Sequence, residues 1–204
     1  MRIRGRTKFW SSLVGPLGRR ESAVVLVIAT SAAARISYNT SRRAGIPRGV
    51  TAGLAAFDLW GGLVAFQFQP TREQYSRSPL ESRMLFALVH VQPFLLPLLG
   101  EGSWRRATGR YATAVVSTAV LECFLSYSTS RRVVANGAAA ALSAADLALG
   151  APAHSWFGPV YLMKMIGGHS GIGRGDAAPG KTSSNTHAPT LVVGAPWRDA
   201  ATGQ

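Results

Sequence analysis

The stretch GVTAGLAAFDLWGGLVAFQ, residues 49–67, decides what kind of fold this chain adopts. It is apolar almost throughout, and its nineteen residues would rise about 28 Å as an α-helix, close to the thickness of a bilayer's hydrocarbon core. The carboxylate of Asp58 lies at its centre. Because a charge at mid-depth in a membrane is costly, its presence indicates either a partner of opposite charge or a function.

Five further apolar stretches accompany this one, at residues 22–38, 83–100, 111–128, 133–151 and 156–168. Together they predict an all-α, multi-pass transmembrane bundle of about six helices. Pro93 and Pro97 predict a kink in the third helix, just after His90. The last stretch is the weakest, because it is short and contains Lys164; it either crosses with tilting or thinning of the bilayer or lies in the interface.

The ends of the chain differ from this apolar middle. Residues 1–21 form a basic leader with interleaved aromatic and aliphatic residues, which we expect to lie on a membrane surface. Residues 22–170 hold the predicted bundle, and residues 171–204 are rich in Gly, Ser and Pro, a composition typical of disorder. The single cysteine, Cys123, can form no intramolecular disulfide, and we expect it to be a buried apolar residue.

Composition and charge favour a membrane over a nucleic-acid partner. The chain is 47% apolar and only 15% charged, whereas soluble domains carry about a quarter charged residues. The net charge is +13, but the arginines lie between apolar runs rather than in one patch, which fits anionic membrane lipid better than nucleic acid. With six crossings, fourteen Lys and Arg residues fall on one side and six on the other. This bias predicts a plasma-membrane protein whose termini are both cytoplasmic.

Ionisable groups recur near the middle of the predicted helices. At 1.5 Å per residue, all of them fall within roughly 7 Å of mid-depth if the helices alternate in direction. Polar residues also share helix faces, as Thr118 and Glu122 do four positions apart. We therefore expect the acidic side chains of several helices to meet in one polar centre. The mid-depth groups are Arg35, Asp58, His90, Glu122, Asp146 and Lys164.

These groups suggest acid catalysis on a lipophilic small molecule, for example an isoprenoid. A carboxylic acid held protonated by apolar surroundings is a general acid, and Asp58 is the first candidate and Glu122 the second. His90 would relay the proton. The candidate substrate-binding residues are Trp60, Gln92, Asn136, Asp146, Arg35 and Lys164.

Two alternatives remain open at this point. In the first, the charges only lock the bundle: Asp58 or Asp146 pairs with Arg35, and Glu122 pairs with Lys164. In the second, the carboxylates carry protons or cations in a small transporter, or the chain is a non-catalytic accessory subunit. The chain is short for a transporter, and no inverted repeat is visible in its sequence.

Several enzyme classes lack their sequence motifs here. There are no paired aspartate clusters for magnesium and a diphosphate, no histidine-rich boxes for a di-iron site, and no HExxH or GxSxG motif. No glycine-rich phosphate loop follows a strand. We therefore expect neither a metal nor a cofactor.

The sequence contains scattered motifs at residues 57–62 (FDLWGG), 69–72 (QPTR) with Tyr75, 90–93 (HVQP), and 156–159 (WFGP) with Lys164. This set resembles uncharacterised small bacterial integral membrane proteins, to which no activity is attached. Separately, the general plan is similar to the membrane-integral terpene cyclases of secondary metabolism, which are small, all-helical and use isolated acidic residues to protonate an alkene or epoxide. This second resemblance implies an isoprenoid substrate, but it is architectural and assigns no catalytic residue.

Overall fold

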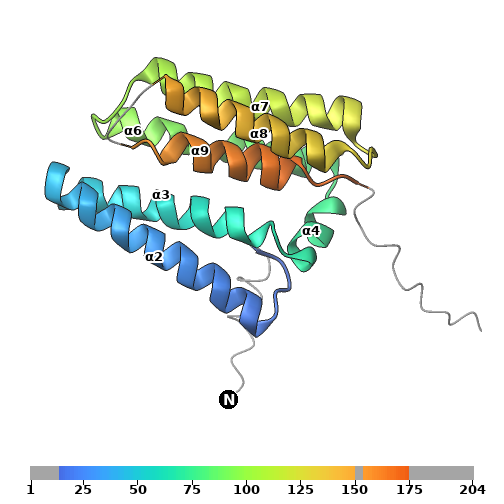
Figure 1. Cartoon of the computed structure of the whole chain (residues 1–204), viewed down its shortest axis with the longest axis horizontal. Coiled ribbons are helices and arrows are strands. Elements are labelled where there is room, and N and C mark those ends of the chain that lie inside the picture. Colours follow the sequence, from blue (N-terminus) through green and yellow to red (C-terminus); the bar gives the residue numbers. More distant parts are fainter. Residues whose placement is uncertain (1–13, 150–153, 175–204) are drawn as a thin grey trace, which may run out of the picture.

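The computed structural model describes residues 14–149 and 154–174, and this part of the chain is helical with no strand (Figure 1). Each of the six predicted apolar stretches falls on helical structure, so the all-α prediction is confirmed. The corresponding segments are α2 (Arg19–Ala44), α3 (Ile46–Ala65), α5 (Leu80–Val89) with η1 (Gln92–Phe94) and α6 (Leu95–Leu98), α7 (Trp104–Leu125), α8 (Arg131–Ala148), and α9 (Phe157–Leu162) with η2 (Met163–Ser170).

Length and composition identify fewer membrane-spanning helices than the sequence pattern predicts. Among the described residues, α2 is long and apolar enough to cross a membrane. α3 passes the same test only together with α4 (Gln69–Ser76), and the two are bent by 91°. Other helices carry more charge; α7, for example, contains three arginines and Glu122.

Helices α2 and α3 form a tight hairpin. The turn between them is at Gly45, whose φ of 93° favours glycine, and Pro47 lies in the first turn of α3. A Cβ at Gly49 would overlap Ser41 Oγ, and a Cβ at Gly53 would lie 2.8 Å from Ser37 Cβ. The small residues therefore allow the two backbones to approach closely, as in packed membrane helices.

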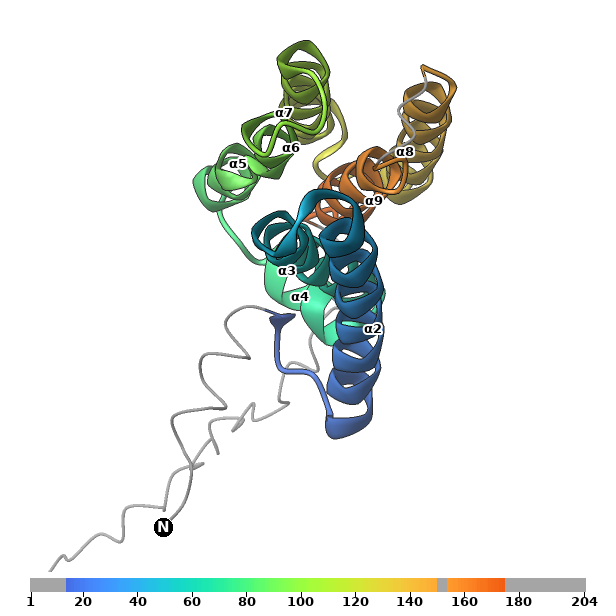
Figure 2. The same cartoon turned by 90° about the vertical axis from the view of Figure 1, so that its left-hand side faces the viewer.

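The continuous segment α9–η2 lies at the centre of the bundle. It packs against α3, α7 and α8, and Figure 2 shows α9 between α8 and the α2–α3 hairpin. Phe157, Tyr161, Met165 and Ile166 are fully buried. The weakest of the predicted stretches is thus the most enclosed one. Because other helices surround it, its short apolar run and its lysine are packed against protein rather than presented outward.

The third predicted helix is broken where the sequence predicts a kink. α5 ends at Val89, and His90 has φ −81° and ψ 61°, outside the helical region. Pro93 explains the break, because its ring would clash with the carbonyl of residue 89 in a continuous helix and it has no N–H to donate. The chain resumes as η1 and α6.

Residues outside the predicted bundle of residues 22–170 pack against the end of the bundle that carries α4. Thr71 of α4 donates a hydrogen bond to the carbonyl of Val14, and Arg174 N–H donates to Ser126 O at 2.9 Å. Ile172 is buried, so the packed bundle extends to residue 174, beyond the predicted start of the tail. Most of the predicted leader and tail, residues 1–13 and 175–204, lies outside the described residues.

Candidate functional site

A cavity of about 610 Å³ lies among α2, α3, α4 and α5, with one residue of η2 in its wall. Most of its surface is aliphatic or aromatic, and the polar groups are few. The chain therefore builds a largely apolar cavity with isolated functional groups, the usual composition of a site for a small lipophilic molecule. The lining residues are Val14, Val25, Ala29, Phe57, Asp58, Gly61, Gly62, Ala65, Phe66, Thr71, Tyr75, Phe86, Val89, His90 and Lys164.

Asp58 and Lys164 form an ion pair in the wall of this cavity. Lys164 Nζ donates to Asp58 Oδ2 at 2.6 Å, and Gln92 Nε2 donates to the same oxygen at 2.8 Å. The lysine side chain is 2% exposed, whereas the aspartate side chain is 50% exposed. Since both hydrogen bonds go to Oδ2, and no described residue bonds Oδ1, the second carboxylate oxygen is available to a molecule in the cavity.

Gly62 provides the space for the lysine. A Cβ at this position would overlap Lys164 Cε and lie 3.1 Å from Nζ. Asp58 and Gly62 are four residues apart on α3, so they lie on one face of the helix and together receive the lysine. At Gly62, therefore, the group that packs against the glycine is the lysine side chain.

His90 reaches the cavity because α5 is broken beside it. Its Nδ1 lies 2.5 Å from the carbonyl of Phe86, which requires the ring hydrogen on Nδ1, and Tyr161 OH donates to the backbone carbonyl of His90 at 3.1 Å. In the neutral ring, Nε2 is then the acceptor. The break thus places an imidazole with a fixed tautomer in the cavity wall.

Aromatic rings form another wall of the cavity. Phe86 lies between two imidazoles, with centroid distances of 4.0 Å to His90 and 4.1 Å to the buried His169. Tyr75 packs edge-on against Phe66 and Phe86. Burial, and to a lesser extent the nearby Asp58 carboxylate, raises the pKa of Tyr75 to about 12, so its phenol stays neutral at physiological pH. These contacts make the aromatic wall rigid.

Glu122 does not lie at this cavity, which corrects the expectation of one shared polar centre. Its Oε1 accepts hydrogen bonds from Arg83 Nε at 2.7 Å and from Arg131 at 2.5 Å, and all three side chains are almost fully buried. The arginines also bind the carbonyls of Ile172 and Ser170. This network fastens the end of η2 to α5, α7 and α8, and its partners differ from the predicted pairing of Glu122 with Lys164.

Asp146 forms a third, separate cluster. Arg110 binds both carboxylate oxygens, at 2.9 and 2.8 Å, and Arg106 Nε lies 3.3 Å from Oδ1. A Cβ at Gly158 would overlap Asp146 Oδ2, so the carboxylate rests against the backbone of α9. Hence the acidic residues of α3, α7 and α8 are each held by their own cations and do not meet.

The remaining predicted substrate-binding residues have different surroundings. Arg35 is exposed on α2 and forms no ion pair within the described part of the chain. Trp60 packs against the core, with its indole N–H buried and without a hydrogen-bond partner among the described residues. Asn136 faces Gly167, where a Cβ would lie 2.8 Å from its Oδ1. Of the nine predicted site residues, the structure places Asp58, His90 and Lys164 at the cavity, with Gln92 bonded to Asp58.

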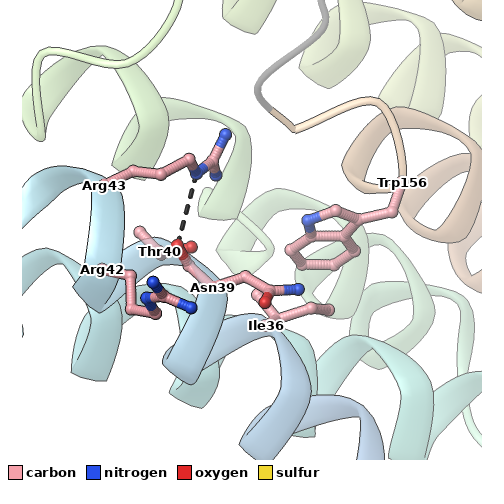
Figure 3. A pocket seen from close by; sticks show the side chains of 6 residues that line it. All are labelled: Ile36, Asn39, Thr40, Arg42, Arg43 and Trp156. Carbon is pink, nitrogen blue, oxygen red and sulfur yellow. Dashed lines mark hydrogen bonds between the residues drawn. The ribbon is translucent and has the colours of Figure 1, made fainter.

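A second hollow, of about 540 Å³, lies at the opposite end of α2 (Figure 3). Its lining comes from the last turns of that helix and from Trp156, which faces Asn39 and Ile36 across the gap. Arg43 Nε donates to the carbonyl of Asn39 at 3.3 Å. Its described lining residues supply arginines, an amide and an indole but no carboxylate or imidazole, so the hollow resembles a surface contact region more than a reaction site.

Sequence reasoning missed several residues of the cavity. Phe86 precedes His90 by four positions, a spacing that places both on one helix face and was an available signal. Thr71, which lines the cavity, and the buried His169, which stacks on Phe86, carry no comparable pattern, because their positions depend on how α4 and η2 pack.

Comparison with known proteins gives no match to a family model, to a curated protein or to a solved structure.

Proposed function

We propose that the chain is an integral membrane protein whose six helical segments cross the bilayer, with α4 lying across one end. The arrangement of side chains supports this proposal: apolar residues face outward on α3, α5, α7 and α8, while arginine, glutamate and lysine are buried inside. A protein in water would normally have the opposite distribution. The outward residues include Leu54, Leu85, Val89, Val116, Phe124, Val133 and Leu147.

The ends of the bundle support the same orientation in a bilayer. Trp156, Arg42 and Arg43 surround the hollow of Figure 3, and tryptophan and arginine are typical of the level of lipid headgroups. Arg19 and Arg20 stand at the other end of α2. The arginine pairs 19–20 and 42–43 lie at opposite ends of α2, so their separation along the helix matches the distance between the two interfaces of a bilayer. The excess of basic residues at the N-terminal end favours cytoplasmic termini in the plasma membrane.

Within this bundle we propose a membrane-embedded enzyme that binds a lipophilic small molecule and transfers protons to and from it. The observation that carries this proposal is the Asp58–Lys164 pair in the wall of an otherwise apolar cavity. A hydrocarbon chain would fill the apolar volume and present its reactive carbon to the pair. An isoprenoid double-bond isomerisation or a cyclisation fits such a site, in line with the architectural resemblance to terpene cyclases.

The groups suit general acid–base catalysis, although their roles differ from the sequence-based hypothesis. Asp58 is not isolated in apolar surroundings; it is paired with an ammonium, so the carboxylate is the proton acceptor and Lys164 the donor. Gln92 donates to Oδ2 and, like the other described residues, leaves Oδ1 without a hydrogen bond. His90 offers Nε2 as a second proton acceptor. Glu122, bound by two arginines, has a structural role in this proposal.

The proposal is tested by proton exchange in deuterium oxide. The full chain, in nanodiscs of phosphatidylethanolamine and phosphatidylglycerol, is incubated with a panel of isoprenoid alkenes, alcohols and epoxides, and mass spectrometry measures deuterium in recovered substrate and product. We expect label with the wild type and a loss of about 10²–10⁴-fold in Asp58→Asn, the usual contribution of a general base. The exposed Glu81→Gln is the matched control and should retain the rate.

Absence of label with every member of the panel contradicts the enzymatic proposal. A pH change inside liposomes that depends on Asp58, without any labelled product, would instead favour the transporter.

A further inference from the structure

The cation at the cavity differs chemically from the other buried cations. The chain contains only three lysines, Lys8, Lys164 and Lys181, against nineteen arginines. Glu122 and Asp146 are both held by arginines, whereas Asp58 is held by Lys164. The one lysine among the described residues is therefore the one that borders the apolar cavity.

Arginine would serve better if the pair were only structural. Its guanidinium binds a carboxylate through two parallel hydrogen bonds and stays charged, as Arg110 does on Asp146. A lysine amine can lose its proton and attack a carbonyl carbon, which a guanidinium does not do. The use of lysine at this place therefore points to a nucleophile.

We infer that Lys164 forms a Schiff base with a lipophilic aldehyde or ketone bound in the cavity, with Asp58 as its counter-ion. This inference rests on the proposed function, because it assumes that the cavity receives a lipophilic molecule. It narrows the substrate class to compounds with a carbonyl group at the end of an alkyl or isoprenyl chain.

The reaction balances within the residues present. Asp58 Oδ2 takes a proton from the ammonium 2.6 Å away, and the free amine adds to the carbonyl carbon to form a carbinolamine. The carbinolamine loses its hydroxyl as water, with a proton from the Asp58 carboxyl, and a protonated imine remains. Ammonium plus aldehyde thus gives iminium plus water, with one positive charge before and after, so the pairing with Asp58 persists.

The surroundings of the lysine favour this chemistry. Gly62 leaves room for its side chain, which is held in one direction with its end group at the cavity wall. Its burial excludes bulk water, which would hydrolyse an imine. Within the described part of the chain, Gln92 bonds to the aspartate and not to the amine, which leaves the amine available to react.

Reductive trapping tests the inference. The full chain in nanodiscs is incubated with a series of aldehydes from hexanal to farnesal in the presence of cyanoborohydride, and peptide mass spectrometry locates the adducts. We expect a mass increase equal to the aldehyde less one oxygen on the peptide containing Lys164. The longer aldehydes should react faster there, because they fill the apolar cavity. Lys8 and Lys181 should not show this dependence on chain length.

Lys164→Arg is the matched variant, because it keeps the cation beside Asp58 but cannot form an imine. We expect complete loss of the adduct at residue 164, with the same melting temperature as the wild type. The inference is overturned if wild-type adducts form only on Lys8, Lys181 or the terminal amine. Farnesol, which has the isoprenyl chain but no carbonyl, separates the two proposals. If farnesol binds the wild type and Lys164→Arg equally while the aldehydes form no adduct at Lys164, the proposal of a lipophilic cavity is supported and the Schiff-base inference is wrong.

Discussion

Lys164 Nζ lies 2.6 Å from Asp58 Oδ2. Lys164 belongs to the central η2 and Asp58 to α3, and the two residues are 106 positions apart. The lysine is buried, while the aspartate opens into the cavity. Because of this asymmetry in burial, removing the aspartate and removing the lysine should change the free energy of unfolding by different amounts.

Asp58→Asn should destabilise the protein more than Lys164→Met. The first variant leaves a buried ammonium without its counter-charge, which costs about 1–3 kcal/mol, whereas the second leaves a carboxylate that is still half-exposed. The double variant should recover most of the loss. Thermal unfolding in detergent measures all three. A larger loss in Lys164→Met than in Asp58→Asn would contradict the asymmetry.

Gly62→Ala should displace the lysine and impair the site. The new Cβ would overlap Lys164 Cε, so the lysine side chain must shift from its present position beside Asp58. We expect proton exchange with the isoprenoid panel to fall. Gly137→Ala is the control, because nothing lies near a Cβ there, and it should be neutral or stabilise α8 by about 0.5–1 kcal/mol. Equal activity in both variants would show that the position of the lysine is unimportant.

Glu122→Gln should be among the most destabilising single changes. It removes the negative charge between two buried arginines, and breaking a buried pair in this way costs about 3–5 kcal/mol. Ser126→Ala, which removes only a hydroxyl that donates to Glu122, is the milder comparison. Denaturant unfolding gives the difference. Material of Glu122→Gln that remains folded should retain the wild-type rate of proton exchange, whereas a selective loss of that rate would return Glu122 to the list of catalytic residues.

Tyr75 should make stability depend on pH in the alkaline range. Since burial raises its pKa to about 12 from an ordinary value of 10, the folded state holds its proton more tightly than the unfolded state. Its contribution is complete below pH 10 and is lost as the pH rises toward 12. Tyr75→Phe keeps the ring contacts and should reduce this fall between pH 10 and 12. Parallel stability curves for the two proteins across that range would rule out the effect.

The helical segments other than α4 could be predicted from the sequence because apolar runs mark them directly, and the break beside His90 followed from Pro93. The ionic partners could not be predicted. Arg83 and Arg131 stand at the ends of apolar runs, where arginines normally anchor to lipid, yet both turn inward to Glu122. Position in the sequence gives an approximate depth, but the partner depends on how each helix is rotated and on which neighbours it has.

The same limit applies to the cavity. Asp58, His90 and Lys164 could be selected as isolated polar groups in apolar runs, and they do line one cavity. Their association depends on α9–η2 being the central segment, which its modest hydrophobicity did not suggest.

The central position of α9–η2 also has a consequence for biogenesis. The ribosome synthesises α9–η2 after α2 to α8, so the other helices cannot complete their packing until this central segment has been made. Until then Asp58 lacks its lysine, Arg83 lacks the carbonyl of Ile172, and Arg131 lacks the carbonyl of Ser170. Assembly should therefore be completed in one late step, and a chain that stops before α9 should be degraded as unfolded protein rather than persist as a partly active one.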